Sequence, residues 1–205
     1  MISVDRLLAA GACALSATVA AAPSMAATEP STAAVKAAAA KYRDVRVAVA
    51  EGYQTDGMCT DARMLGFNAS EGGMGLHYVR KDLIGIQPRA QGRRVAGTKI
   101  HTDFLRPSML VYEPQRHGGL KLVAVENLVF QSAWKAAGHA KPPTFHGRPY
   151  VLLKDNPATK VDEAHGFEPH YELHVWAFRH NPSGMFKEFN PAVTCRFNKP
   201  AAKHK

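Results

Sequence analysis

The 205-residue sequence lacks the signatures of several large protein classes. It has no G-x-S-x-G motif, no P-loop and no H-E-x-x-H motif, so it carries no signature of a catalytic nucleophile or a phosphate-binding loop. Its longest apolar run falls short of the ~20 residues that a transmembrane helix needs. No RNP-like motif, basic helix or helix-turn-helix pattern is present. We therefore expect neither a transmembrane span nor specific binding of nucleic acid.

Acidic residues are fewer than basic ones, 17 against 26, which gives a net charge of +9. The positive side chains are scattered rather than gathered on one predicted element. Some of them lie in one predicted loop and others in the C-terminal tail: Arg89, Arg93, Arg94 and Lys99 in the loop, and Lys199, Lys203 and Lys205 in the tail. A scattered charge favours solubility and a loose attraction to anionic envelope surfaces.

The N-terminal segment has the composition of an export signal. Residues 7–22, LLAAGACALSATVAAA, are apolar and rich in small residues, and Arg6 and the amino terminus precede them with positive charge. Small residues follow, which predicts cleavage after Ala26 or Ala27. We expect residues 1–27 to be a signal peptide and the protein to be periplasmic or secreted.

Only three cysteines are present. Cys13 lies in the predicted signal; lipid modification there is an alternative, although Ala10 stands where a lipoprotein signal carries leucine. The remaining pair, Cys59 and Cys195, is an even number in an oxidising compartment, which predicts a disulfide between them. Thiol chemistry is the alternative for this pair.

Residues 28–205 are sufficient for one globular domain with a sizeable core. The last residues, 198–205, are basic, and we expect them to form a flexible tail. A single strong helix is predicted over residues 31–52, with Ser31 as its N-terminal cap and Gly52 at its end. Its apolar residues recur every three or four positions, so one face should pack on a sheet.

After this helix the apolar pattern changes to period two or to short apolar runs separated by Gly and Pro. The region 142–169 is rich in Pro, Gly and Asp and is predicted to be a long surface loop. Residues 131–138 could form a short helix. The predicted strands are residues 75–79, 108–113, 120–130 and 170–179. The fold class is therefore α+β, mainly an antiparallel β-sheet or small barrel with one N-terminal helix packed on it.

The last predicted strand carries ionisable residues on alternate positions, in the segment EPHYELHVWAF. In a strand, His170, Glu172 and His174 share one face with Trp176 and Phe178. Both faces are otherwise apolar, which is typical of a central strand. Burying polar groups costs free energy unless they are partnered, so this face needs a partner, and a metal ion is one candidate.

Two further residues fit the same logic. His77 begins a strand after the glycines of GGMGLHYV, and Glu126 lies in the apolar strand LVAVENLVF. Together with His170 and His174 they predict a mononuclear site of three histidines and one glutamate. This ligand set suits several transition metals. We favour zinc or copper from the predicted compartment, with iron, manganese and nickel also compatible.

Strand geometry constrains this set. Residues two apart on a strand are separated by ~6.7 Å, and residues four apart by ~13 Å. Three arrangements remain open: Glu172 and His174 bind the ion without His170, the chain has a bulge or bend near Pro169, or the segment is a helix. We expect a bend that brings His170 inward. A buried network of hydrogen-bonded histidines and carboxylates, with no metal, is the alternative.

Over residues 41–197 the chain resembles a group of exported bacterial proteins through the motifs GGMGLHYV, LVYEP, VAVENLV, HYELHVWAF and NPSGMFKEFNPAVTC. The resemblance implies export and implies no activity. A cupin-like metal barrel would unite the strands with the predicted ligands. However, the sequence lacks the H-x-H followed closely by Glu of that pattern, so cupins are an analogy only.

The predicted site favours a metal-dependent enzyme acting on a small molecule. Glu172 is the candidate catalytic base; alternatively it contacts the ligands without binding the metal, or replaces one of them. Tyr78, Trp176 and Phe178 are expected to line an apolar cavity around the ion. The alternative is a non-catalytic protein of the periplasm or the medium that binds a metal or another ligand.

Overall fold

The computed structural model describes residues 28–87 and 92–199. The predicted signal peptide at residues 1–27, with Cys13, lies outside the described residues, as do Arg89 and the tail from residue 200 onward. Among the described residues, no helix has the length and apolar character that crossing a membrane requires.

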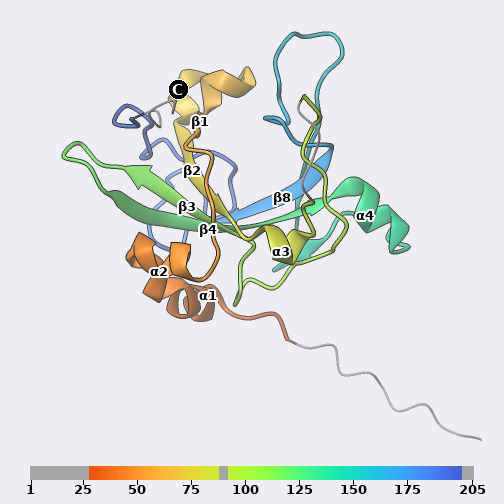
Figure 1. Cartoon of the computed structure of the whole chain (residues 1–205), viewed down its shortest axis with the longest axis horizontal. Coiled ribbons are helices and arrows are strands. Elements are labelled where there is room, and N and C mark those ends of the chain that lie inside the picture. Colours follow the sequence, from red (N-terminus) through yellow and green to blue (C-terminus); the bar gives the residue numbers. More distant parts are fainter. Residues whose placement is uncertain (1–27, 88–91, 200–205) are drawn as a thin grey trace, which may run out of the picture.

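A six-stranded, antiparallel, curved sheet forms the centre of the structure (Figure 1). In spatial order its strands are β1 (Cys59–Asp61), β2 (Gly73–Val79), β3 (Met109–Pro114), β4 (Leu120–Phe130), β8 (His170–Val175) and β7 (Val151–Leu153). The predicted α+β class is confirmed. The four predicted strands correspond to β2, β3, β4 and β8. β2 begins two residues earlier than predicted, and β8 ends at Val175 and not at residue 179, so Trp176 and Phe178 lie beyond the strand.

The predicted N-terminal helix is present in three pieces. They are α1 (Thr32–Ala39), the 3-10 turn η1 (Ala40–Arg43) and α2 (Val45–Ala50). Ser31 caps α1, as predicted, by accepting a hydrogen bond from the Ala34 amide at 3.1 Å. Asp44 interrupts the helix because its backbone is extended and its carboxylate caps α2, accepting from the Arg46 amide at 3.0 Å. An aspartate that can bond to the backbone two residues ahead favours this local break over a continuous helix.

The two faces of the sheet have different partners. The helices α1 and α2 pack on one face (Figure 1), where they form the largest apolar core with Leu110, Tyr112 and Leu173. The Tyr112 hydroxyl donates to the Tyr42 carbonyl at 2.7 Å and links the sheet to η1. Strand alternation then places the ionisable residues of β8 on the opposite face.

The region 142–169 contains more regular structure than predicted. Besides β7, it holds a small two-stranded sheet of β5 (Thr144–Phe145) and β6 (Arg148–Pro149). Its apolar residues, such as Phe145 and Leu153, are buried, and their packing holds this region against the core. Only residues 154–169 remain as a loop. The other short elements are η2 (Ala62–Leu65), η3 (Ala69–Glu71), α3 (Lys81–Ile84) and α4 (Gln131–Ala136).

The predicted disulfide is confirmed. Cys59 and Cys195 are bonded across a sequence separation of 136 residues, with their Cα atoms 5.6 Å apart. The bond joins the edge strand β1 to the C-terminal segment of the described chain. It therefore fastens the end of the sheet that carries β2.

We predict that replacing both cysteines, Cys59→Ala with Cys195→Ala, lowers the free energy of unfolding. A closed loop of this length constrains the unfolded chain, with an effect of up to about 5 kcal/mol in the chain-entropy model. Urea unfolding followed by circular dichroism measures the change. Reductant should lower the wild-type midpoint to that of the double variant and leave the variant unchanged; a wild-type midpoint insensitive to reductant would contradict the prediction.

Candidate metal centre

The pairing of β4 with β8 creates the first contact of the site. Glu126 and His174 are directly opposite each other in the antiparallel register. Opposed residues on one face have Cβ atoms only ~4.5–5.5 Å apart, so their side chains meet. The Glu126 Oε2 atom lies 3.2 Å from Nε2 of His174, and both side chains are 1% exposed.

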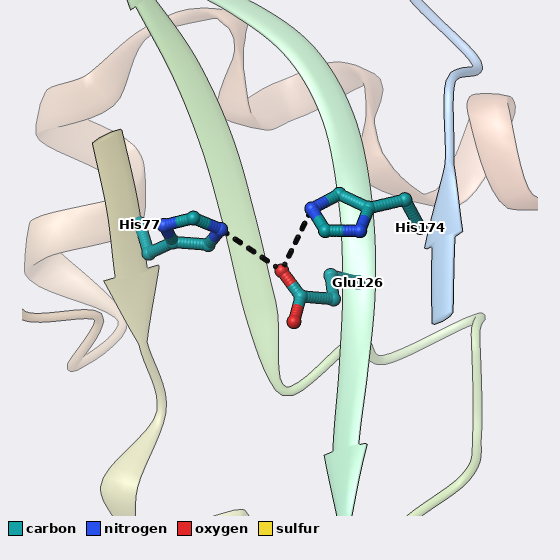
Figure 2. A group of neighbouring side chains, drawn as sticks. All are labelled: His77, Glu126 and His174. Atoms are coloured by element: carbon teal, nitrogen blue, oxygen red, sulfur yellow. Dashed lines mark ion pairs between the residues drawn. The ribbon is translucent and has the colours of Figure 1, made fainter. Parts of the chain in front are cut away.

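His77 reaches the same carboxylate from β2, on the other side of β3 (Figure 2). Its Nε2 atom lies 3.1 Å from Oε2 of Glu126. Gly75 permits this approach of β2, because a Cβ at that position would lie 2.7 Å from the Tyr112 carbonyl oxygen and its φ is +118°. The glycines before His77 therefore let the backbone lie close to β3.

The three side chains converge, but several of their polar atoms lack a hydrogen-bond partner within the described part of the chain. Neither oxygen of Glu126 and neither ring nitrogen of His174 has a hydrogen-bond partner among the described residues, although all four atoms are buried. Unpartnered buried polar atoms are rare in native proteins, and a missing ion is one recognised cause. The ligand atoms of His77, Glu126 and His174 lie within 4.8 Å of one another, so this group could hold a metal ion.

The electrostatics of this group favour a cation. Burial alone would lower the pKa of His77, but the negative charge of Glu126 and its contact with the ring outweigh burial, and the pKa is raised. A site that stabilises the positive form of a buried imidazole also stabilises a metal ion placed beside the same carboxylate.

A second group with the same composition lies next to the first. The ligand atoms of His165, His170 and Glu172 also lie within 4.8 Å of one another. Nε2 of His170 is 3.3 Å from Oε2 of Glu172, and both side chains are buried. Burial opposes ionisation of Glu172, yet contacts with His170 and His174 hold the pKa of this carboxyl below its usual range.

The structure distributes the predicted ligands over these two groups. His77, Glu126 and His174 come together, whereas His170 belongs to the second group. The bend expected at His170 is absent, because β8 pairs with β4 in unbroken register from His170 to Val175. A regular strand keeps residues four apart at ~13 Å, which is too far for one ion. Glu172 lies between the groups, with Oε1 4.0 Å from Nδ1 of His174.

His165 was missed by the sequence reasoning, which took histidines outside the strands to be surface residues. It lies in the loop before β8, and its ring stacks against the ring of His77 with centroids 6.5 Å apart. The available signal was its position five residues before His170. Glu188 was also missed: burial, reinforced by the charges of Glu172 and Glu126, raises its pKa to about 8.

A cavity of about 620 Å³ opens onto both groups, and His77, Glu126, His165 and Glu172 line it. Much of the remaining wall is apolar, whereas exposed polar residues lie at its margin. The apolar wall includes Val79, Ile86, Val95, Met109, Leu128 and Phe167, and the margin includes Gln54, Asp56, Lys81 and Asp162.

The aromatic residues predicted to line the cavity lie elsewhere. Tyr78 follows His77 directly and so points to the opposite face, where its ring meets that of Tyr112 with centroids 5.0 Å apart. Phe178 packs against the helix-side core. Trp176 alone contacts the site, stacking on His174 at 5.5 Å with an interplanar angle of 10°. It supports a candidate ligand from behind and does not face the cavity.

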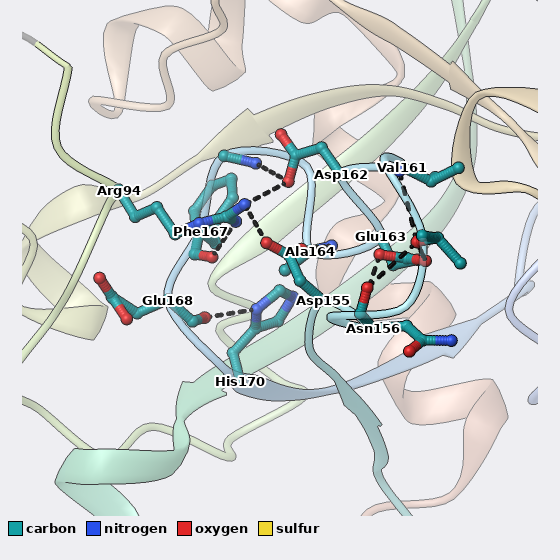
Figure 3. Close-up of polar contacts among 12 residues, drawn as sticks. Arg94, Asp155, Asn156, Val161, Asp162, Glu163, Ala164, Phe167, Glu168 and His170 are labelled. Atoms are coloured by element: carbon teal, nitrogen blue, oxygen red, sulfur yellow. Dashed lines mark hydrogen bonds and ion pairs between the residues drawn. The ribbon is translucent and has the colours of Figure 1, made fainter.

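The loop of residues 154–168 carries His165 and is fastened by Arg94 (Figure 3). The Arg94 guanidinium pairs with Asp155 and, at 2.9 Å, with Asp162. It also donates to the Phe167 carbonyl at 2.8 Å. Backbone hydrogen bonds of Val95 with residues 166 and 168 extend this attachment.

We predict that Arg94→Ala increases amide hydrogen exchange in residues 155–168 by about tenfold or more, because hydrogen bonds to charged groups contribute ~1.5–3 kcal/mol. Mass spectrometry of exchanged peptides measures the effect. The control is Arg46→Ala, which removes an exposed ion pair with Asp44 far along the chain. Unchanged exchange in the loop of the Arg94 variant would show that other contacts hold it.

Comparisons of this chain with protein-family models, with curated proteins and with solved structures give no match. Function is therefore inferred from the site. Two histidine–carboxylate groups on one sheet face, both open to one cavity, are the features that any function has to use.

Proposed function

We propose that this protein is exported and binds a transition-metal ion through His77, Glu126 and His174, as a metal-dependent enzyme acting on a small molecule. The observation that carries the proposal is the convergence of three ligand atoms, two of them on buried side chains, at the wall of a cavity of about 620 Å³. A purely structural site would not need such a cavity.

The number of ligands supports catalysis over structure. Structural zinc sites are closed by four protein ligands, whereas catalytic ones use three and keep a position open. Two histidines and one carboxylate also form the ligand set of non-haem iron oxygenases. Zinc and copper remain favoured from the proposed compartment, and iron, manganese and nickel are compatible with the same ligands.

Glu172 is the proposed catalytic base. Its carboxylate lines the cavity, where a substrate can reach it. Its Oε1 atom is buried without a hydrogen-bond partner. The bound metal would supply Lewis acidity or an activated water, while Glu172 would hold the proton that leaves the reacting group.

The cavity defines the class of substrate. Its walls are largely apolar, and the ionisable residues His77, Glu126, His165 and Glu172 also line it. Sites of this volume and character bind small organic molecules, and a few polar groups fix the orientation of the ligand. We propose a substrate with an apolar body and one polar group directed at His77 and Glu126.

Export is part of the proposal. The apolar N-terminal segment, the resemblance to exported proteins and the Cys59–Cys195 disulfide support it. The intact mass of protein recovered from the periplasm or medium tests it, since cleavage after Ala26 or Ala27 removes a defined mass.

We predict that Glu126→Gln and His174→Ala each lose one equivalent of bound metal relative to the wild type. Removal of a ligand should weaken binding by more than the ~10–100-fold that loss of an outer partner costs. Elemental analysis of protein purified without an affinity tag measures this, with near-ultraviolet circular dichroism to confirm folding. His117→Ala, in the exposed β3–β4 turn, is the matched control. Wild-type metal content in both ligand variants would refute the proposed site.

We predict that azide or cyanide changes the visible spectrum of the cobalt- or copper-loaded protein, because an open coordination position faces the cavity. The same titration of Glu126→Gln is the control for metal bound elsewhere. If neither anion reaches the ion, the site is closed. The protein would then be a non-catalytic metal-binding protein, and the enzyme proposal would fail.

A further inference from the structure

The group of His165, His170 and Glu172 has features of a ligand set in its own right. All three residues contribute to one small volume, with ligand atoms within 4.8 Å of one another. His170 and Glu172 are 0% and 1% exposed. His165 and Glu172 also line the cavity that His77 and Glu126 line.

The hydrogen bond of His170 orients its ring for ligation. Nδ1 of His170 lies 2.9 Å from the Glu168 carbonyl oxygen, which can only accept, so Nδ1 carries a proton and donates it (Figure 3). In the neutral ring, Nε2 then carries a lone pair. This lone pair faces Oε2 of Glu172 at 3.3 Å, an arrangement of two acceptors that needs either a second proton or a cation between them. The same carbonyl-bonded histidine is the usual arrangement behind a metal ligand.

His165 is held in a strained conformation that directs its ring inward. Its φ is +37°, a left-handed value that is uncommon for residues other than glycine. Such residues cost free energy and cluster at functional sites. Its Nε2 atom is buried and has no hydrogen-bond partner among the described residues. This buried nitrogen is therefore available to bind a metal ion.

His146 also has a positive φ, of +48°. These two are the non-glycine residues with positive φ in the described part of the chain. His146 is exposed, and its Nε2 atom lies 2.9 Å from the Pro30 carbonyl oxygen, so its unusual backbone serves a surface contact. The comparable backbone of His165 instead places an unpartnered nitrogen beside Glu172.

We propose that His165, His170 and Glu172 bind a second divalent transition-metal ion, so that the cavity holds a dinuclear centre. Glu172 would link the two positions through the ring of His174. Its Oε2 faces His170 at 3.3 Å, while its Oε1 lies 4.0 Å from Nδ1 of His174, whose Nε2 meets Glu126. The inference deepens the proposed function, since the second ion shares the cavity of the first; with both ions bound, Glu172 is a ligand, and its role as base belongs to the form with one ion.

The charge of this region supports a second cation. Each ion pair of Glu126 and Glu172 in the described part of the chain is with a histidine. Glu188 adds a third carboxyl whose Oε1 atom is buried and unpartnered. Burial and the charges of the other two raise the pKa of Glu188 to about 8. An ion held by His77, Glu126 and His174 leaves Glu172 with histidines as its ionic partners, so this carboxylate can bind a second cation.

The test is the number of zinc ions bound by chelator-treated full-length protein, measured by titration and by elemental analysis after dialysis. We expect two per chain in the wild type and one in His165→Asn. Asparagine tolerates a positive φ, so this variant should keep the loop conformation. His170→Asn is the second variant, because its amide can still donate to the Glu168 carbonyl. His117→Asn is the control and should bind two.

The failures of the two proposals are distinguishable. If the wild type binds one ion, which His174→Ala loses and His165→Asn keeps, the second position is refuted and the first stands. If His174→Ala keeps its single ion and His165→Asn loses it, the first position is refuted. If folded wild type binds none, both are refuted. For the wild type loaded with two copper(II) ions, electron paramagnetic resonance should show magnetic coupling. Two uncoupled signals would refute a shared centre.

Discussion

The unbroken antiparallel pairing of β4 with β8 is the constraint on which the site depends. It sets Glu126 opposite His174, Leu128 opposite Glu172 and Phe130 opposite His170. Because side chains alternate along a strand, a slip of one residue would turn these ionisable groups toward the helices. The apolar residues on the other face of β8, including Leu173, hold the register by packing into the main core.

The two faces of the sheet have different roles: one packs against the helices and stabilises the fold, and the other carries the candidate ligands. The face that carries Leu110 and Tyr112 packs against α1 and α2 and supplies the apolar burial that holds the fold together. The opposite face can therefore bury carboxylates and histidines, which cost free energy in isolation. Both faces share the same backbone, so the packing on one side positions the polar groups on the other.

The sequence predicted the strands and most of the polar residues because these follow from local patterns. The alternation of His170, Glu172 and His174 showed that they share a face, and the apolar surroundings of Glu126 showed that it is buried. The register in which the strands pair was not predictable, since it depends on contacts between distant segments. The set of His77, Glu126 and His174 draws on three strands, and no local pattern specifies that combination.

Two other differences have separate physical reasons. The position of Tyr78 was available from the sequence, because period-two alternation places it on the face opposite His77. The role of His165 was not, since it depends on a left-handed backbone in a loop fastened by Arg94, and that conformation arises from tertiary contacts.

The spacing of β8 explains why one motif gives two groups of ligands. Alternate residues on a strand are ~6.7 Å apart, so neighbouring members of His-x-Glu-x-His can approach each other while its two ends cannot. The other members of each group come from other parts of the chain. Glu126 contacts both His174 and His77, whereas the loop residue His165 lies beside His170. The central Glu172 contacts both ends, with one oxygen directed to each. A substitution of Glu172 therefore removes a contact from both groups. This shared carboxylate connects the loop that carries His165 to the sheet that carries His77.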